Sequence, residues 1–152
     1  MIDLAIRMND EAEVFEDGVE RKFRSDIEGH GYILDGKADR IASMPEGLVI
    51  YDYKKGRAFS KDKITDKSLQ FYIYRLLVER ELSMHVARAS FVTLTDGKIS
   101  DIDLSESDDY VLSVLDEAAE GMRKGSWTAL PDEDKCGSCS FRMICRRRFT
   151  VQ

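Results

Sequence analysis

The chain has 152 residues, 43% hydrophobic and 34% charged, which is an ordinary composition for one globular domain with a modest core. No basic segment followed by an apolar stretch opens the chain, and no apolar run approaches the roughly 18 residues of a membrane span, so we expect a cytoplasmic protein without a membrane partner. The net charge of −6 argues mildly against nucleic acid, but five basic residues and no acid lie in 135–148, so a local basic surface for DNA stays open.

The first third of the chain predicts a short helix and then three antiparallel strands. Residues 9–18 (NDEAEVFEDG) form the expected helix, although their apolar face is thin. Residues 19–29 alternate apolar or small side chains with charged ones, as an exposed strand does. Residues 31–41 and 47–56 read as two more strands, separated by the turn-prone sequence SMPEG at 43–47.

Residues 65–83 contain the clearest helix of the sequence. Thr65 or Asp66 is placed to cap it. Its expected apolar stripe consists of Leu69, Tyr72, Ile73, Leu76 and Leu77. Residues 85–104 then predict two strands joined by a tight turn at Asp96 and Gly97.

Residues 105–125 predict a second long helix. Ser105 with Asp108 three residues later resembles a capping box. Its core-facing side chains are expected to be Tyr110, Val111, Val114, Leu115 and Ala118. Because no repeat or domain boundary is visible, we expect a single α/β domain over residues 1–152.

Two neighbouring predicted strands carry charges that strands usually avoid. Asp52 and Lys54 share one face of their strand because side chains alternate with period two. If the strands pair through the turn near Pro45, Asp39 lies beside Asp52. Two carboxylates at a strand end suit Mg²⁺ or Mn²⁺, and a lysine beside the metal can hold or deprotonate water. These are the ingredients of phosphoester hydrolysis. For Asp52 and Lys54 alone, plain charge compensation on an exposed strand is the alternative interpretation.

The helix that follows carries a polar pair beside its apolar stripe. Gln70 and Tyr74 are four residues apart and therefore share a helical face. An ordinary amphipathic helix with a polar boundary has the same pattern.

Three cysteines, Cys136, Cys139 and Cys145, lie close together in the pattern C-x2-C-x5-C. An odd number of clustered cysteines without an export signal favours metal binding over disulfides. Zinc held by the three cysteines and one other ligand remains an alternative to iron.

Taken in order, GKADRI, VIYDYKKG, LQFYIY and CGSCSFRMIC resemble the motifs of the PD-(D/E)XK nucleases. The resemblance is to the RecB-like branch with C-terminal iron–sulfur cysteines, which includes CRISPR-associated RecB-like exonucleases and helicase-nuclease subunits. It runs from about Glu20 to Arg148. It implies a restriction-endonuclease-like mixed sheet, with an antiparallel meander, a helix and further strands flanked by helices, and a cysteine-rich metal-binding segment at 135–148.

The resemblance implies a role for each matching residue. Asp39 and Asp52 would bind Mg²⁺ or Mn²⁺ together with the Tyr53 carbonyl, while Glu20 occupies a position where relatives often carry glutamate. Lys54 would place the attacking water and stabilise charge on the phosphate. Gln70 and Tyr74 would orient the site and contact DNA. Cys136, Cys139 and Cys145 would bind an iron–sulfur cluster of the 4Fe-4S type. The candidates for DNA backbone contacts are Lys55, Arg57, Lys61, Arg146, Arg147 and Arg148.

Two pieces of the family pattern have no clear counterpart in the sequence. A fourth cluster cysteine is missing. The first catalytic motif, a histidine or glutamate on a helix ahead of the strands, is also missing, although Glu11, Glu13 and Glu16 are available. We expect the chain to be the C-terminal part of a larger protein; loss of these elements, or their supply by a partner, are the alternatives. The isolated His30 and His85 are expected to be surface residues.

The expected function is that of a Mg²⁺- or Mn²⁺-dependent deoxyribonuclease, an exonuclease acting on single-stranded ends. DNA repair, recombination or CRISPR adaptation would be its pathway, with a helicase or adaptation proteins as partners. The alternative is a catalytically impaired DNA-binding or scaffolding module that keeps the nuclease fold inside a larger complex.

Overall fold

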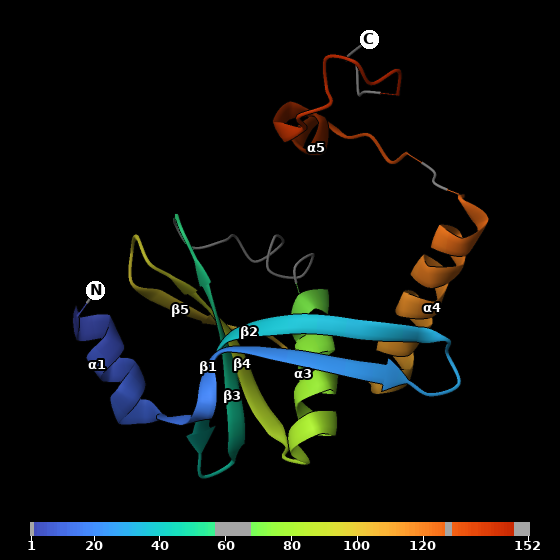
Figure 1. Ribbon diagram of the computed structural model, residues 1–152. Helices are drawn as coiled ribbons and strands as arrows, with labels where there is room; N and C mark the ends of the chain where they lie inside the picture. Colours follow the sequence, from blue (N-terminus) through green and yellow to red (C-terminus); the bar gives the residue numbers. More distant parts are fainter. Residues whose placement is uncertain (1, 57–67, 127–128, 148–152) are drawn as a thin grey trace. The chain divides into compact units, whose positions relative to one another are not determined.

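The computed structural model describes residues 2–56, 68–126 and 129–147. Along the chain the elements are α1 (Ile2–Glu11), β1 (Glu13–Ile27), β2 (Tyr32–Met44), β3 (Gly47–Lys54), α3 (Leu69–Leu82), β4 (Val86–Thr93), β5 (Lys98–Asp101), α4 (Asp108–Lys124) and α5 (Glu133–Ser138), as drawn in Figure 1. Their order confirms the predicted α/β class.

The strands form one mixed sheet in the order β1-β2-β3-β4-β5. The first three strands pair antiparallel, which confirms the predicted meander, and β4 pairs antiparallel with β5. Among the strands of the described residues, only β3 and β4 run parallel. Parallel neighbours need a long crossover connection, and α3 lies in that crossover. The helix is therefore held against the sheet next to the C-terminal end of β3.

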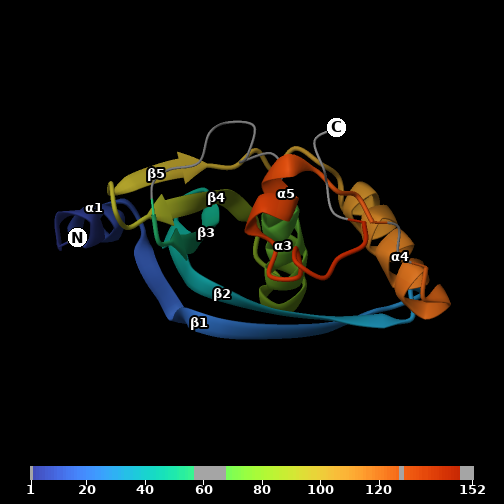
Figure 2. The ribbon, with the colours of Figure 1, turned by 90° about the horizontal axis from the view of Figure 1, so that it is seen from above.

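Both faces of β3 are covered, which explains its nearly continuous apolar sequence. Leu48 and Ile50 belong to a core that contains Phe71 and Leu77 of α3. Val49 and Tyr51 belong to a second core, with Leu4 and Met8 of α1. Figure 2 shows β3 and β4 lying between α1 and α3. Asp52, the next buried residue of β3, must therefore face either α1 or α3.

The prediction of a helix at residues 9–18 is wrong. The helix lies earlier, at Ile2–Glu11, and β1 already begins at Glu13. Leu4 and Met8 lie one helical turn apart and bury against the sheet. After Ala12 the chain pairs with β2 instead, with Val14 opposite Ala42, so sheet pairing prevails over the weak local helical pattern.

The predicted helix at 65–83 is present as α3, and Thr65 and Asp66 lie outside the described residues. Its buried set is broader than the predicted stripe and includes Phe71, Arg75 and Val78. The sheet covers one side of α3, while Arg75 on another side binds the connection between β5 and α4. A helix that is covered on more than one side carries apolar residues on most of its faces, so its sequence shows only a weak division into an apolar and a polar face.

The predicted helix at 105–125 begins three residues later, at Asp108. Its first turn is capped by Ser107, whose Oγ accepts a hydrogen bond from the Tyr110 amide at 3.2 Å. Ser105 lies three residues before the helix, and its amide donates to the Asp103 carboxylate at 2.9 Å. Of the five side chains expected to face the core, only Val111 is buried.

The chain divides into two compact units, Met1–Asp116 and Glu117–Gln152, and the boundary falls within α4. The first unit contains the sheet, α1 and α3; the second contains α5 and the cysteine segment. Among the described residues no helix is long and apolar enough to cross a bilayer.

Truncating the fully buried Leu77 tests the contact between α3 and the sheet. Leu77→Ala removes side-chain volume from the core shared with Ile50 and Phe91. We expect the free energy of unfolding to fall by about 2–5 kcal/mol in urea denaturation. Arg80→Ala, on the exposed part of the same helix, should change it by less than about 0.5 kcal/mol. Equal effects would contradict this packing.

Candidate active site

Asp52 is a carboxylate buried beneath α3, with only 4% of its surface exposed. Burying a carboxylate is costly unless hydrogen bonds and opposite charge compensate it. Gln70 Nε2 donates a hydrogen bond to Oδ1, and Lys54 Nζ lies 2.6 Å from Oδ2. Apart from this ion pair, no hydrogen-bond partner of Oδ2 is found among the described residues. One buried carboxylate oxygen is thus held by the charge of Lys54.

Lys54 lies on the same face of β3 as Asp52, as the two-residue spacing predicts. Its ammonium is 5.5 Å from the centre of the Phe91 ring, on the neighbouring strand β4. About a third of the side chain remains exposed. The lysine is therefore fixed by an aromatic face and an ion pair while its ammonium stays within reach of solvent.

Asp39 joins β2 to β3 through its side chain. The backbone pairing of these strands reaches Arg40 opposite Tyr51. Beyond that pair, the Tyr53 amide donates to Asp39 Oδ2 at 2.8 Å. This bond brings Asp39 to the end of β3 that carries Asp52, as expected. The amide of Tyr53, not its carbonyl, makes the recorded contact.

Gln70 and Tyr74 meet on the face of α3 that covers Asp52. Gln70 Nε2 lies 3.3 Å from Tyr74 Oη as well as contacting Asp52. Burial raises the pKa of Tyr74 above its ordinary value, and the negative charge of Asp52 raises it further. The predicted polar pair is therefore present, and the tyrosine stays protonated at neutral pH.

A glycine allows Tyr74 to lie against β2. A Cβ placed on Gly36 would come within 3.0 Å of Leu77 Cδ1 and 3.5 Å of Tyr74 Cε1. The strand and the helix are in close contact at this point, and a larger residue would push them apart.

The sequence interpretation missed Lys37. This lysine forms an ion pair with Glu20 on β1, and its pKa is raised first by that hydrogen bond and then by the negative charge of Glu20. Asp39 and Tyr74 are also within electrostatic reach of Lys37. The spacing Lys37-x-Asp39 mirrors Asp52-x-Lys54, and that symmetry is the signal that could have identified it.

Glu20 lies at the margin of this group rather than inside it. Its carboxylate pairs with Lys37 and is 59% exposed. Its backbone adopts a left-handed φ of 53° within β1. Such a conformation in a strand is strained for a residue with a side chain.

The donor set fits an oxygen-preferring divalent cation. Asp39 and Asp52 offer carboxylate oxygens, and Asp52 Oδ2 is a buried acceptor without a hydrogen bond. No group of three histidine, cysteine or acidic side chains suited to a metal occurs in the described ranges. Mg²⁺ is commonly bound by one or two carboxylates, with water and substrate phosphate completing its shell, so the two aspartates suffice.

The cysteines do not form such a group. Cys136, Cys139 and Cys145 lie in the second unit, and none of them forms a disulfide among the described residues. Three thiols that are not gathered together do not by themselves fit a four-ligand cluster.

The basic candidates and the isolated acids and histidines are only partly described. Lys55, Arg146 and Arg147 are exposed, whereas Arg57, Lys61 and Arg148 lie outside the described residues. Among the other residues considered, Glu11 pairs with Arg88, His30 with Asp116 and His85 with Glu79. Each of these three has a partner away from Asp52.

The sheet order and the grouped aspartates agree with a family model that matches residues 3–146, described as the PD-(D/E)XK nuclease superfamily. The chain belongs to this superfamily. The match extends over the elements from α1 to α5. No curated protein matches the chain.

Among solved structures, the chain is similar to the crystal structure of SSO0001. The TM-score is 0.59 at 18% sequence identity, and the match covers 98% of this chain and 66% of the other. The chain thus spans slightly less than two thirds of that structure. At this identity the likeness concerns the fold.

The raised pKa of Tyr74 predicts a stability that depends on pH. In the unfolded chain the phenol ionises near pH 10, whereas in the folded chain it ionises higher. Unfolding therefore releases a proton above about pH 10, and this part of the stability is lost as pH rises toward the folded pKa.

Tyr74→Phe should consequently lose less stability than the wild type between about pH 9.5 and 11 in urea denaturation. Tyr110→Phe, at an exposed tyrosine, is the matched control and should follow the wild type. If the free energy of unfolding fell equally with pH in all three proteins, the environment described for Tyr74 would be contradicted.

Proposed function

We propose that the chain hydrolyses phosphodiester bonds of DNA in a reaction that depends on Mg²⁺ or Mn²⁺. Membership of the nuclease superfamily supports nuclease chemistry in general. The observation that carries the proposal is the buried Asp52, with Lys54 and Gln70 in direct contact and Asp39 at the same strand end. A buried carboxylate with a lysine in direct contact, beside a second carboxylate, is suited to binding a cation and is characteristic of functional sites.

Asp39 and Asp52 would hold the metal ion, and Glu20 and the Tyr53 carbonyl remain proposed further ligands. When bound, such an ion polarises the phosphate and lowers the pKa of a water molecule. Gln70 fixes the orientation of the Asp52 carboxylate through its hydrogen bond. A fixed carboxylate loses less entropy on binding than a mobile one.

Lys54 acts on the water and on the developing charge. Its ammonium is fixed by Phe91 and Asp52, so it can place a water molecule for attack on phosphorus and stabilise the pentacovalent phosphate. Hydrolysis adds the water across the P–O bond, and its proton ends on the leaving oxygen. The protonated Tyr74 hydroxyl can donate a hydrogen bond to a phosphate oxygen.

The DNA backbone would be bound by cations around the site. Lys37 lies beside Asp39, and Lys55 is exposed directly after β3. With these lysines in contact with phosphates, affinity should fall with rising salt. Arg57, Lys61, Arg146, Arg147 and Arg148 remain proposed contacts. We propose single-stranded ends as the substrate, in DNA repair, recombination or CRISPR adaptation.

Removing Asp52 or Lys54 tests the catalytic assignment. Asp52→Asn and Lys54→Ala should each lower Mn²⁺-dependent cleavage of end-labelled DNA by about 100-fold or more, because charge at the reacting phosphate is no longer stabilised. Product lengths from single- and double-stranded labelled substrates report whether cleavage starts at ends.

Asp109→Asn and Lys22→Ala, both at exposed positions, are the matched controls and should cleave normally. Circular dichroism must show that the Lys54 variant is folded, because it leaves the Asp52 charge buried without its counter-ion. Unchanged cleavage in both site variants would reject the assignment, and a wild type that binds DNA without cleaving it would favour the scaffolding alternative.

The cysteine segment is the subject of a separate proposal. We propose that Cys136, Cys139 and Cys145 supply three thiolates to an iron–sulfur cluster or to zinc, with a fourth ligand from outside the described residues. The chain purified anaerobically should then contain iron and absorb visible light, or contain one zinc. Cys139→Ser should lower the metal content, and a metal-free wild type would refute this proposal.

A further inference from the structure

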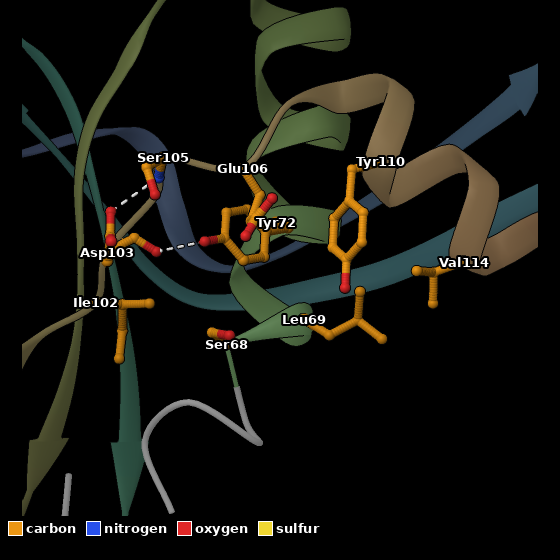
Figure 3. Close-up of a pocket in the computed structure, with 9 residues that line it drawn as sticks. All are labelled: Ser68, Leu69, Tyr72, Ile102, Asp103, Ser105, Glu106, Tyr110 and Val114. Carbon is orange, nitrogen blue, oxygen red and sulfur yellow. Dashed lines mark hydrogen bonds between the residues drawn. The ribbon is translucent and has the colours of Figure 1, made fainter. Parts of the chain in front are cut away.

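A pocket of about 330 Å³ lies beside the first turn of α3. Its walls come from α3, from the connection between β5 and α4, and from the first turns of α4 (Figure 3). The lining residues are Ser68, Leu69, Tyr72, Ile102, Asp103, Ser105, Glu106, Tyr110 and Val114. None of them belongs to the candidate active site, but Leu69 directly precedes Gln70.

The wall of this pocket is firmly held. Arg75 donates to the carbonyl oxygens of Leu104 at 2.7 Å and Glu106 at 2.8 Å, and it pairs with Asp108 at 2.6 Å. The Tyr72 hydroxyl donates to the Asp103 carbonyl at 2.8 Å, as Figure 3 shows. These bonds fix the backbone of the connection, so the pocket exists before any ligand arrives.

The side chains in the pocket combine aromatic surface with hydrogen-bond acceptors. Tyr110 is 51% exposed, although it lies at the start of a helix that buries its neighbour Val111. In Figure 3 its ring and that of Tyr72 lie on either side of the pocket, with Leu69 between them at one edge. The exposed Glu106 carboxylate and Asp103 add negative charge, and among the described residues no basic side chain lines the pocket.

We propose that this pocket binds one unpaired nucleobase of the DNA strand, and that it prefers bases carrying an exocyclic amine. A flat ring would stack on Tyr110, and its amino group would donate to Glu106. Carboxylates accept from the amino group of cytosine, whereas thymine presents a carbonyl oxygen at that position. The acidic lining disfavours a phosphate, so the backbone lies outside the pocket.

The pocket and the candidate active site share the first turn of α3. This inference rests on the proposed function, which brings a single strand to Asp52. Leu69 in the pocket and Gln70 in the active site are adjacent residues, with Cα atoms about 3.8 Å apart. A strand bound at Asp52 would pass the first turn of α3, whose Leu69 and Tyr72 line the pocket, so that a base next to the bound phosphate could enter it. The pocket would select which nucleotide stands next to the cleaved bond.

The test measures binding apart from cleavage. Fluorescence anisotropy of labelled dC and dT 12-mers is recorded at fixed salt with Ca²⁺ in place of Mn²⁺, and gels verify that the oligonucleotides stay intact. We expect the wild type to bind the dC 12-mer about tenfold more tightly than the dT 12-mer. Tyr110→Ala should weaken binding of both by about fivefold or more, and Tyr110→Phe should retain it.

Glu106→Gln should reduce the preference for dC over dT to about onefold, because an amide both donates and accepts. Asp109→Asn, at a neighbouring exposed acid, should keep the preference. A wild type without preference, or Tyr110→Ala and Glu106→Gln variants that bind like Asp109→Asn, would overturn the proposal and leave the pocket to another ligand, such as a protein side chain.

Cleavage with Mn²⁺ is measured in parallel to separate the two proposals. If the wild type cleaves DNA but the pocket variants bind both oligonucleotides normally, the base pocket is refuted and the nuclease stands. If the wild type does not cleave, yet binding depends on Tyr110 and Glu106 as expected, the pocket stands and hydrolysis is refuted.

Discussion

The burial of one carboxylate organises this structure. Asp52 is enclosed between β3 and α3, and its charge is tolerated because Lys54 and Gln70 contact its two oxygens. Those contacts require β3 to place two charged residues on one face and require α3 to begin where its second residue meets the strand. The crossover between parallel strands satisfies both requirements. Fold and site therefore constrain each other: the topology places the helix, and the helix makes the buried charge tolerable.

The helix α3 also separates two environments with different chemistry. Gln70 and Tyr74 face the aspartates, whereas Leu69 and Tyr72 line the pocket on another side. Arg75, buried in the same helix, ties down the connection that forms the pocket wall. Under the two proposals, one rigid element would set the distance between the place of bond cleavage and the place where a base is held. Side chains on a helix keep such a relation more precisely than side chains on a loop.

Local patterns in the sequence predicted those parts of the structure that local rules determine. The meander, the turn at Asp96 and Gly97, and the pairing of Gln70 with Tyr74 follow from strand alternation, turn chemistry and helical spacing. The first helix could not be placed correctly, because residues after Ala12 take their structure from β2, a partner far along the chain. Ser107 rather than Ser105 caps α4 because the helix begins at Asp108, while the Ser105 amide is bound in the preceding turn by the Asp103 carboxylate. Lys37 was missed because its relation to Tyr74 exists only after folding. The roles of Asp39, Asp52 and Lys54 remain predictions, although their proximity is now established for the folded chain.

Gly36 has a consequence that extends beyond its own strand. Because it lacks a side chain, β2 can lie close to Leu77 and Tyr74 of α3. A methyl group added here would meet Leu77 Cδ1 at 3.0 Å and Tyr74 Cε1 at 3.5 Å, so the Leu77 side chain or the helix would have to give by a few tenths of an ångström. Gln70 lies on the same helix, and any shift of α3 would therefore reach Asp52 without altering a residue of the site. In evolution, such a position can tune activity from outside the reaction centre, and it would be overlooked in a search limited to charged residues.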